Sequence, residues 1–308
     1  MFGTAALLAA IALSPAALLA RYQPVTVLHP AEPFAPVAVE GFLADAELQA
    51  RIPGGWSTVV PQPALLPTAS PPEWRLDHPC SAAPGVASIA CYSASEALRH
   101  PPNVVYGAVR PAANRIALQY WYWYSYDFWD GVLPATDDVW QAHEGDWEAV
   151  TVVLTRRGTP LFVGLSEHIC GKRRAWRTVP RWRGTHPVVH VAFGSHANSF
   201  HARPQPMDLR RECYDPTGAA LLRAALPAVL DFMGEGRRFG PRGAGTTTRI
   251  VRVTPTSPAW MAYPGWWGEA QFFHVGGRTF VGDAPTRGPA RHELWRYPVG
   301  TPRGWSTG

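Results

Sequence analysis

The stretch VVYGAVRPAANRIALQYWYWYSYD, residues 104–127, decides the fold. Two apolar runs flank a Pro-Ala-Ala-Asn turn, a pattern that predicts a β-hairpin. Alternate residues of the second run share a face, and both faces carry aromatic rings. Such a strand is covered on both sides or borders a ligand site on one side, so Trp123 is a candidate ligand-binding residue. The hairpin is predicted to form the centre of a β-rich core.

Composition favours the same fold class. The chain has 308 residues, 46% of them hydrophobic, with 14 Trp, 32 Pro and 28 Gly. This is enough apolar material for a packed core, and the Pro and Gly content argues against a helical bundle. Further strands are predicted at residues 147–155, 160–166 and 187–193. The expected fold is mainly β, a β-sandwich with a few peripheral helices and long loops.

Other segments are predicted to be helix or loop. Helical spacing occurs at residues 39–51 and again at residues 215–236. Residues 52–102 are rich in Pro, Gly and Ser and lack the apolar periodicity of a core, so they are predicted to form a loop-rich insertion. The chain from residue 21 to residue 308 is otherwise expected to form a single domain.

The first twenty residues, MFGTAALLAAIALSPAALLA, carry no charge from Phe2 to Ala20. That length is close to what a bilayer core requires. A cleaved signal peptide is one interpretation, although a basic n-region is absent and the cleavage signal around Ala17 is loose. An uncleaved membrane anchor followed by Arg21 is the other. Either interpretation predicts a protein that is secreted or membrane-anchored outside the cytoplasm.

Cysteine usage agrees with export. The chain has four cysteines and no CxxC pair, which argues against a zinc finger. An even count in an exported chain predicts two disulfides. The favoured pairing joins Cys80 to Cys91 across a short loop and leaves Cys170 with Cys213; four unpaired buried thiols are the alternative.

The net charge of +5 comes mostly from arginines that are spread along the chain. The densest group is GKRRAWRTVPRWR, residues 171–183, where Arg and Trp interleave. This segment either contacts phosphates or a lipid headgroup, or forms a solvated hairpin with the Trp side chains tucked underneath. No nucleic-acid-binding module is recognisable, so nucleic acid is not expected as a partner. A monomer is expected.

The segment HEGDWEAVTVVL, residues 143–154, brings charge to the start of an apolar strand. In an extended chain Asp146 and Glu148 share the face of the following valines. Carboxylates crowded at the rim of a core repel one another, and burial favours their protonation. Three arrangements would relieve the repulsion between the two carboxylates: a Lys or Arg partner, a divalent cation, or a metal-free acid/base pair. For a cation, Gly145 lets the backbone bend and bring His143 round.

Further candidates stand where predicted strands end. Asp127 closes the aromatic strand, His168 follows LFVGLSE, and His196 lies in GSHANSF. Three such residues at strand ends are expected to converge, with Glu144, on a ligand. An oxygen-rich donor set with one imidazole favours Mg²⁺, Ca²⁺ or Mn²⁺ over Zn²⁺.

Several segments together resemble a known family. ALQYWYWYSYD, HEGDWEAVTV, SEHICGKRRAW, HPVVHVAFGSHANSF and YPGWWGE follow RYQPVTVLHPAEPFAPVAVEGFL in this order. The set resembles the vacuolar protein sorting-associated protein 62 family over most of the chain. HEGDWE is also similar to the metal-binding heptapeptide GHRHDWE of necrosis- and ethylene-inducing-like proteins. Those toxins have a β-sandwich related to actinoporins and fungal lectins, bind a divalent cation and engage sphingolipid headgroups.

The second resemblance implies a metal set of four residues: Asp127, His143, Asp146 and Glu148. The segment between Asp127 and His143 is longer than in the toxins. Asp127 therefore has three alternatives: Asp130, Asp137 and Asp138. Gly145 and Glu144 replace a histidine and an arginine of the heptapeptide, so the toxins' headgroup specificity is not implied.

Three function classes remain. The first is an exported, metal-stabilised β-sandwich that binds a glycan or a lipid headgroup, with activity on membranes as one form of it. The second is a metal-dependent hydrolase in which the cation activates water and Glu144 or His196 moves protons. The third is a purely structural envelope protein. Because no GxSxG or HExxH motif occurs, binding is favoured over catalysis, and whether the chain is an enzyme stays open.

Overall fold

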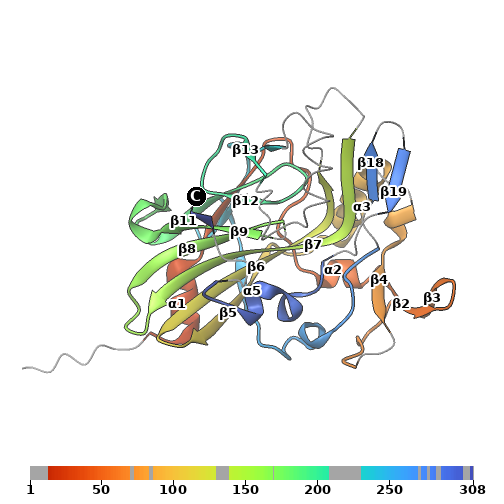
Figure 1. Ribbon diagram of the computed structural model, residues 1–308, viewed down its shortest axis with the longest axis horizontal. Coiled ribbons are helices and arrows are strands. Elements are labelled where there is room, and N and C mark those ends of the chain that lie inside the picture. Colours follow the sequence, from red (N-terminus) through yellow and green to blue (C-terminus); the bar gives the residue numbers. More distant parts are fainter. Residues whose placement is uncertain are drawn as a thin grey trace, which may run out of the picture.

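The predicted hairpin lies at the centre of the structure, a computed structural model that describes residues 13–69, 73–82, 86–129, 139–168, 170–207, 230–269, 272–275, 278–281, 286–300 and 306–307. Strand β5 (Val104–Ala112) turns into β6 (Arg115–Trp129), and β7 (Val139–Thr155) pairs antiparallel along β6. These long strands cross the whole molecule (Figure 1). The sequence therefore predicted the hairpin correctly.

The hairpin belongs to the larger of two stacked sheets. Its strand order is β17-β5-β6-β7-β8-β9-β20, and β18 pairs with the first part of β7 and with β19. The remaining strands of this sheet are β8 (Pro160–Glu167), β9 (Cys170–Ala175), β17 (Arg249–Arg252), β18 (Phe272–Val275), β19 (Arg278–Val281) and β20 (Ser306–Thr307).

A smaller sheet covers one face of β6 and β7. Its order is β10-β11-β1-β15-β16, with β12 paired to β11. The bounds are β1 (Val25–Leu28), β10 (Arg181–Trp182), β11 (His186–Val191), β12 (Asn198–Ser199), β15 (Arg238–Gly240) and β16 (Thr246–Thr247). Val189 and Val191 of this sheet share one core with Val150 and Val152 of the larger sheet. The fold is thus mainly β and sandwich-like, as predicted.

Tryptophan rings cover the opposite face of β6 and β7. Trp123 lies with its ring centroid 5.1 Å from that of Trp147 and 5.3 Å from that of Trp267, and Trp260 closes the group. Because these rings enclose it, Trp123 is 0% exposed. The expectation that Trp123 contacts a ligand is therefore wrong. Three short helices belong to this layer: η3 (Ala259–Ala262), η4 (Pro289–Arg291) and α5 (Glu293–Arg296).

The segment predicted as a short helix, residues 39–51, is helical only in part, and the predicted loop-rich insertion contains regular strands. Helix α2 covers only Glu40–Leu43, and β2 (Glu47–Ile52) forms a small sheet with β3 (Gly55–Pro61) and β4 (Trp74–Asp77). The overlooked signal is the turn at Pro53–Gly54, where Gly54 has a φ of +90°. The sequence was misread because Ala46 and Ala50 fit the helical spacing of four residues, whereas Leu48 and Ala50 fit the alternation of a strand.

The insertion also contains a helix, of which the sequence suggested only a single turn at residues 93–100. Helix α3 (Val86–Arg99) follows the short helix η1 (Pro79–Ala82), and the predicted disulfide between Cys80 and Cys91 joins them. Cys213 and residues 215–229 of the other predicted helix lie outside the described residues, as do Asp130, Asp137 and Asp138. The end of that helix prediction is wrong, because β14 (Leu230–Asp231) pairs there with β13 (Gln205–Pro206).

The N-terminal helix α1 (Pro15–Tyr22) is packed against the sandwich. Ser14 caps it, and the side chains of Leu19 and Tyr22 are buried in the main core. No helix within the described part of the chain has the length and apolarity that a membrane crossing requires.

Candidate metal centre

Gly145 interrupts the alternation of β7 and decides which side chains meet. Asp127 pairs with His143 in the β6–β7 register, whereas Asp146 pairs with Tyr124, three residues away from Asp127. In a regular pleated strand these two residue pairs would lie on opposite faces of the sheet. Gly145 has a φ of +58°, which resets the alternation between them. Asp127, His143 and Asp146 consequently face the same side.

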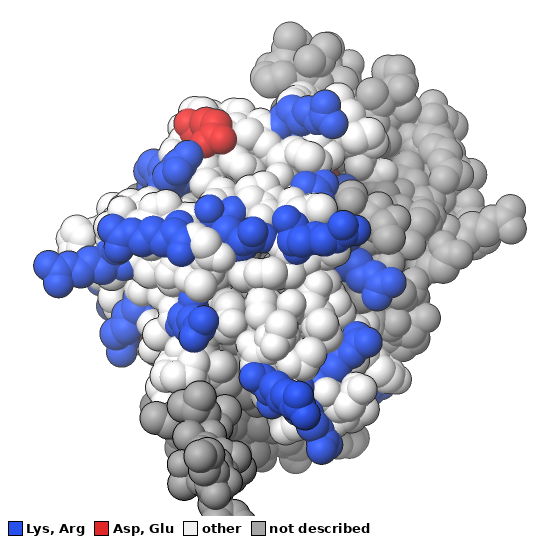
Figure 2. Space-filling model, turned by 90° about the vertical axis from the view of Figure 1, so that its left-hand side faces the viewer, with Lys and Arg blue, Asp and Glu red and all other residues white. Residues whose placement is uncertain are grey.

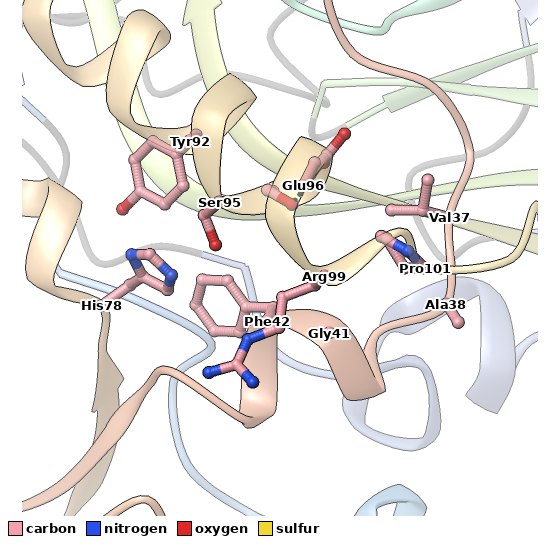
Figure 3. A pocket seen from close by; sticks show the side chains of 11 residues that line it. Val37, Ala38, Gly41, Phe42, His78, Tyr92, Ser95, Glu96, Arg99 and Pro101 are labelled. Carbon is pink, nitrogen blue, oxygen red and sulfur yellow. Dashed lines mark hydrogen bonds between the residues drawn. The ribbon is translucent and has the colours of Figure 1, made fainter.

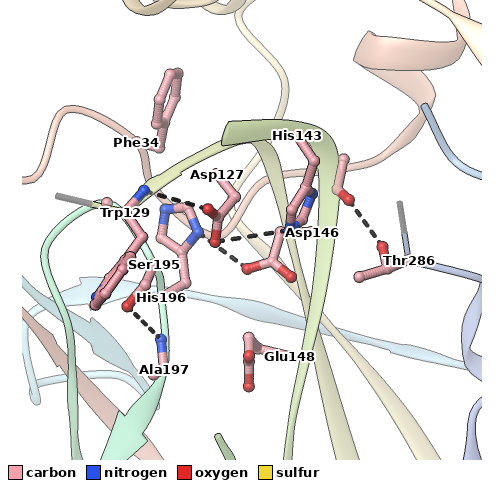
Figure 4. A network of polar contacts seen from close by, with 12 residues as sticks. Phe34, Asp127, Trp129, His143, Asp146, Glu148, Ser195, His196, Ala197 and Thr286 are labelled. Atoms are coloured by element: carbon pink, nitrogen blue, oxygen red, sulfur yellow. Dashed lines mark hydrogen bonds and ion pairs between the residues drawn. The ribbon is translucent and has the colours of Figure 1, made fainter. Parts of the chain in front are cut away.

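Three buried side chains form the cluster on that side. One carboxylate oxygen each of Asp127 and Asp146 and one nitrogen of His196 lie within 4.8 Å of one another. His143 adds a fourth group, with its Nε2 3.8 Å from Asp127 Oδ2. Figure 4 shows these side chains turned toward one another at the ends of β6 and β7. Two oxygen donors and imidazole nitrogen form a donor set for a divalent cation.

His143 is oriented so that one nitrogen is free to accept. Its Nδ1 lies 3.1 Å from the carbonyl oxygen of Glu144. A carbonyl can only accept, so we assign the proton to Nδ1. Nε2 is then the nitrogen that faces Asp127, and it presents a lone pair whenever it carries no proton. A lone pair facing a carboxylate is stable only if a cation, either a proton or a metal ion, lies between them.

His196 is held from three sides. Its Nδ1 donates to Asp146 Oδ2 at 3.1 Å, and its Nε2 lies 3.5 Å from Glu32 Oε1. The ring stacks parallel on Tyr124 with centroids 3.9 Å apart. Burial lowers the pKa of His196, but Glu32 and Asp146 outweigh it and raise the pKa to about 10. His196 is thus an imidazolium that orients Asp146.

One imidazolium does not balance the buried acids. Among the described residues, no Lys or Arg nitrogen lies within 4.0 Å of the carboxylates of Asp127, Asp146 or Glu148. Burial raises the pKa of Asp127 to about 6, and burial together with Asp146 raises the pKa of Glu148 well above its ordinary value. The cluster therefore gains from a doubly charged cation.

Two of the predicted residues have partners beside the cluster. Glu148 accepts from Asn198 Nδ2 at 2.9 Å and from the hydroxyl of Ser166. His168 Nε2 lies 3.1 Å from Asp231 Oδ1, and that contact is the main reason why its pKa is raised to about 10 in spite of burial. Both therefore border the cluster, with one polar atom of each already engaged, Oε2 of Glu148 and Nε2 of His168.

Glu144 points to the opposite face. It accepts from the hydroxyl of Tyr92 and from the backbone N–H groups of His78 and Glu269. The cavity beside His78 and Tyr92, between α2 and α3, measures only about 10 Å³ (Figure 3), room for about one water molecule. The expectation that Glu144 touches a ligand is thus wrong, because the reset at Gly145 turns it away.

The buried Glu144 predicts a pH-dependent stability. Burial raises its pKa to about 8, far above the value of an unfolded glutamate. The unfolded chain therefore loses this proton first, and stability falls as pH rises from about 4.5 to about 8. We expect Glu144→Gln to remove a pH-dependent loss on the order of 3 kcal/mol in urea denaturation with chelator present. The exposed control Glu235→Gln keeps the wild-type slope; an unchanged slope in Glu144→Gln contradicts the assignment.

Sequence reasoning missed the residues that support the cluster. Glu32 accepts from the backbone N–H of Gly194 at 2.7 Å and fixes His196, although it lies in a Pro-rich stretch with no local signal. Asp231 anchors both His168 and Ser195. Only Asn198, two residues after His196, could have been suspected from its neighbourhood.

Fold and site define a β-sandwich protein with a buried carboxylate–histidine centre on its longest strand pair. No family model matches the chain, and no curated protein matches it. Several solved structures are similar to the chain at low sequence identity. Necrosis and ethylene inducing protein 2, from the causal agent of cocoa's witches' broom disease, is 17% identical over 61% of this chain and 68% of its own, with a TM-score of 0.31.

Two further solved structures are similar at the same level. NLPPya in complex with glucosamine is 17% identical, covering 62% of this chain and 69% of its own, with a TM-score of 0.33. A structure described as a toxin fold for microbial attack and plant defense is 15% identical, covering 78% and 76%, with a TM-score of 0.33. These are proteins of the class that HEGDWE resembles, whereas none of the comparisons supports the vacuolar sorting resemblance. Family membership is not established at these values.

Proposed function

We propose that this protein binds a divalent cation through Asp127, Asp146 and His143, and that the ion helps it to bind a glycan or lipid headgroup. The observation that carries the proposal is that one carboxylate oxygen each of Asp127 and Asp146 lies within 4.8 Å of the other and of a His196 nitrogen, and that His143 Nε2 lies 3.8 Å from Asp127, in a buried site with too little positive charge. When bound, the cation supplies a coordination point for hydroxyl or anionic oxygens of a ligand. His196 holds Asp146 in position.

The donor set supports this assignment. His143 turns its Nε2 toward Asp127, and its Nδ1 is fixed by a carbonyl, which is the usual arrangement of a metal-binding imidazole. His143 is also the most accessible member of the group, with 11% of its side chain exposed against 5% for Asp127. A ligand would therefore approach from the His143 side. Oxygen-rich coordination supports Mg²⁺, Ca²⁺ or Mn²⁺ ahead of Zn²⁺.

We favour binding over hydrolysis because the groups expected to move protons are not available. Glu144 is held by three donors on the other face of the sheet. His196 is 0% exposed and stacked on Tyr124. A general acid or base must reach the substrate directly or through one water molecule. Neither residue meets this condition.

We also propose that the protein works outside the cytoplasm. The disulfide between Cys80 and Cys91 supports this, because such bonds persist in oxidising compartments. The uncharged N-terminal segment supports export by either interpretation given above.

Metal addition is expected to stabilise the protein. A cation at about one hundred times its dissociation constant adds roughly 2.7 kcal/mol, which raises the melting temperature of a domain this size by about 4 °C. The measurement is a thermal melt of chelator-stripped protein with Mg²⁺, Ca²⁺ or Mn²⁺, with K⁺ at equal ionic strength as control. No metal in the purified protein and no shift with any of the three divalent ions would overturn the proposed centre.

Ligand binding is tested separately. Glucosamine, the ligand in the NLPPya complex described above, and mannosamine, the ligand in another NLPPya structure similar to this chain, serve as first probes beside a glycan array. Binding that disappears with chelator and returns with the cation supports the proposal. Turnover of a glycosidic or ester substrate that requires Asp146 would support the hydrolase instead.

A further inference from the structure

One face of the domain is basic. It is formed by the turn after β7, by β9, by the short helix η2 (Trp176–Thr178) and by the turns after β10 and β15. We call it the basic face and define it by six exposed side chains: Arg156, Arg157, Arg173, Arg177, Arg183 and Arg242. Figure 2 shows Lys and Arg side chains running in a row across this side of the molecule, with acidic side chains visible only at its upper edge.

Nearby acids do not neutralise the basic face. Glu167 is buried and pairs with Lys172 at 2.7 Å, and Asp231 is buried beside His168. Within the described part of the chain, the six arginines form no ion pair with a carboxylate. Their charges therefore face solvent and attract anions.

Tyr22 joins the first two segments of the basic face. Its ring packs edge-on against Trp176 of η2, with ring centroids 5.6 Å apart. Its hydroxyl donates to the carbonyl of Gly158 at 3.3 Å, next to Arg157 in the turn after β7. The turn that carries Arg157 therefore lies beside η2, which carries Arg177.

Further contacts continue this row to the turns after β10 and β15. The guanidinium of Arg181, in β10, lies over the Trp176 ring with its Cζ 5.0 Å from the centroid, so β10 follows η2 in space. Arg183 comes directly after β10. A Cβ built on Gly243 would lie 3.6 Å from Arg183 Nη2, which makes the turn with Arg242 the next neighbour. The exposed arginines are thus arranged as a continuous row.

The chemistry of the row suits a polymeric anion. A guanidinium group presents its N–H donors in a plane and binds two oxygens of one carboxylate or similar oxyanion at once. Six such groups follow one another along the basic face. They match a chain that carries an acidic group on successive units better than a single small anion, because linked groups bind together.

The basic face lacks the apolar side chains of a lipid-binding surface. Surfaces that attach proteins to membranes usually bury apolar side chains among the lipids beside the basic ones. None of the segments that form the basic face contributes to the exposed large apolar side chains of the described residues, which are Leu13, Ile52, Val59, Val60, Leu65, Leu98 and Tyr297. A polyanion in solution therefore fits this face better than a bilayer.

We propose that the basic face binds a linear acidic polysaccharide whose carboxylate or sulfate groups pair with successive arginines. The choice of a polysaccharide over a nucleic acid rests on the location outside the cytoplasm proposed above. The basic face is separate from the metal centre. Roughly 30 Å of strand lies between Asp146, near the start of β7, and Thr155, which ends β7 beside Arg156.

The first test measures binding of the full chain to polygalacturonate, which carries carboxylates, and to heparin, which also carries sulfates. Chelator is present throughout, so the metal centre stays empty and the two proposals can fail separately. Fully methyl-esterified polygalacturonate is the matched control, because it keeps the sugar backbone without the charge. Tight binding to polygalacturonate identifies carboxylate as sufficient, and tight binding to heparin alone identifies sulfate.

We expect at least about tenfold tighter binding to an acidic polymer than to the methyl ester, since each exposed ion pair contributes about two- to fivefold. This preference is expected to disappear at high salt, where screening shortens the range of the interaction. Galacturonic acid as a monomer is expected to bind at least about a hundredfold more weakly than the polymer.

Charge reversal identifies the face. One variant changes three of its members: Arg173→Glu, Arg177→Glu and Arg183→Glu. It is expected to bind the acidic polymer at least about tenfold more weakly, with an unchanged melting temperature, because three exposed pairs are lost. The matched control makes the same change on exposed arginines away from this face: Arg51→Glu, Arg291→Glu and Arg296→Glu. It is expected to bind as the wild type does.

Three results would overturn the proposal. The first is equal affinity for the acidic polymers and the methyl ester. The second is an equal loss of affinity in the two triple variants. The third is tighter binding to phosphatidylglycerol vesicles or to RNA than to either acidic polysaccharide at matched charge, which would assign the basic face to a different partner.

Discussion

Replacing Gly145 with alanine is expected to destabilise the domain by about 4 kcal/mol or more, enough to unfold much of the population. A Cβ at this position would lie 2.2 Å from the carbonyl oxygen of Trp267 and 2.4 Å from Cη2 of Trp123. Neither atom can move easily, because one is backbone and the other is enclosed by rings. The φ of +58° adds the strain of a left-handed backbone for a residue with a side chain.

Gly158→Ala is the matched control. Its φ of +82° is also positive, but a Cβ there would meet nothing within 4 Å. This variant is expected to lose only about 1 kcal/mol, the cost of the backbone conformation alone. Urea denaturation of both variants measures the difference. If Gly145→Ala and Gly158→Ala lose similar free energy of unfolding, close packing around Gly145 does not maintain the backbone conformation of β7 at this residue.

Asp146→Asn and Asp127→Asn are each expected to reduce cation affinity by more than about a hundredfold, because each removes a charged ligand from the proposed centre. The melting temperature of either variant should no longer respond to the cation. Titration calorimetry and elemental analysis of the purified variants measure the effect. Asp45→Asn, which changes a carboxylate paired with Arg99 away from the cluster, is expected to leave the affinity unchanged.

His196→Ala separates an orienting residue from a ligand. Loss of its hydrogen bond to Asp146 is expected to lower affinity by about 10- to 100-fold without abolishing binding. Wild-type affinity in either Asp variant would contradict the proposed ligand set. Wild-type affinity in His196→Ala alone would contradict only the role of this ring.

Local alternation predicted the central strands well, because β6 and β7 each pair with long neighbours and bury their side chains regularly. It failed where short strands depend on distant partners. The segment Glu47–Ile52 becomes a strand because β3 and β4 pair with its two edges. Helix α3 depends in a similar way on contacts made elsewhere, among them the disulfide and the bond from Tyr92 to Glu144. Such partners are not visible in a local window.

The sequence identified the residue types of the candidate centre better than their arrangement. It expected Gly145 to bring His143 round to Asp146, and the resemblance implied Asp127 as a further ligand; in the structure Asp146 and His143 both lie near Asp127. It could not predict on which face of the sheet the Glu144 side chain lies, because that depends on the backbone conformation of Gly145, which packs against Trp267. It could not find Glu32, which lies more than a hundred residues earlier in the chain and reaches His196 only through the fold.

The four tryptophans packed behind Gly145 also provide an internal optical reporter. Trp123, Trp147, Trp260 and Trp267 have ring centroids 5.1 to 5.7 Å apart, close enough for their electronic transitions to couple. Near-ultraviolet circular dichroism should therefore carry a strong indole signal that depends on their mutual orientation. Any change in the backbone of β7 at the centre would alter that spectrum, so events on one side of the sheet can be followed from the other without a label.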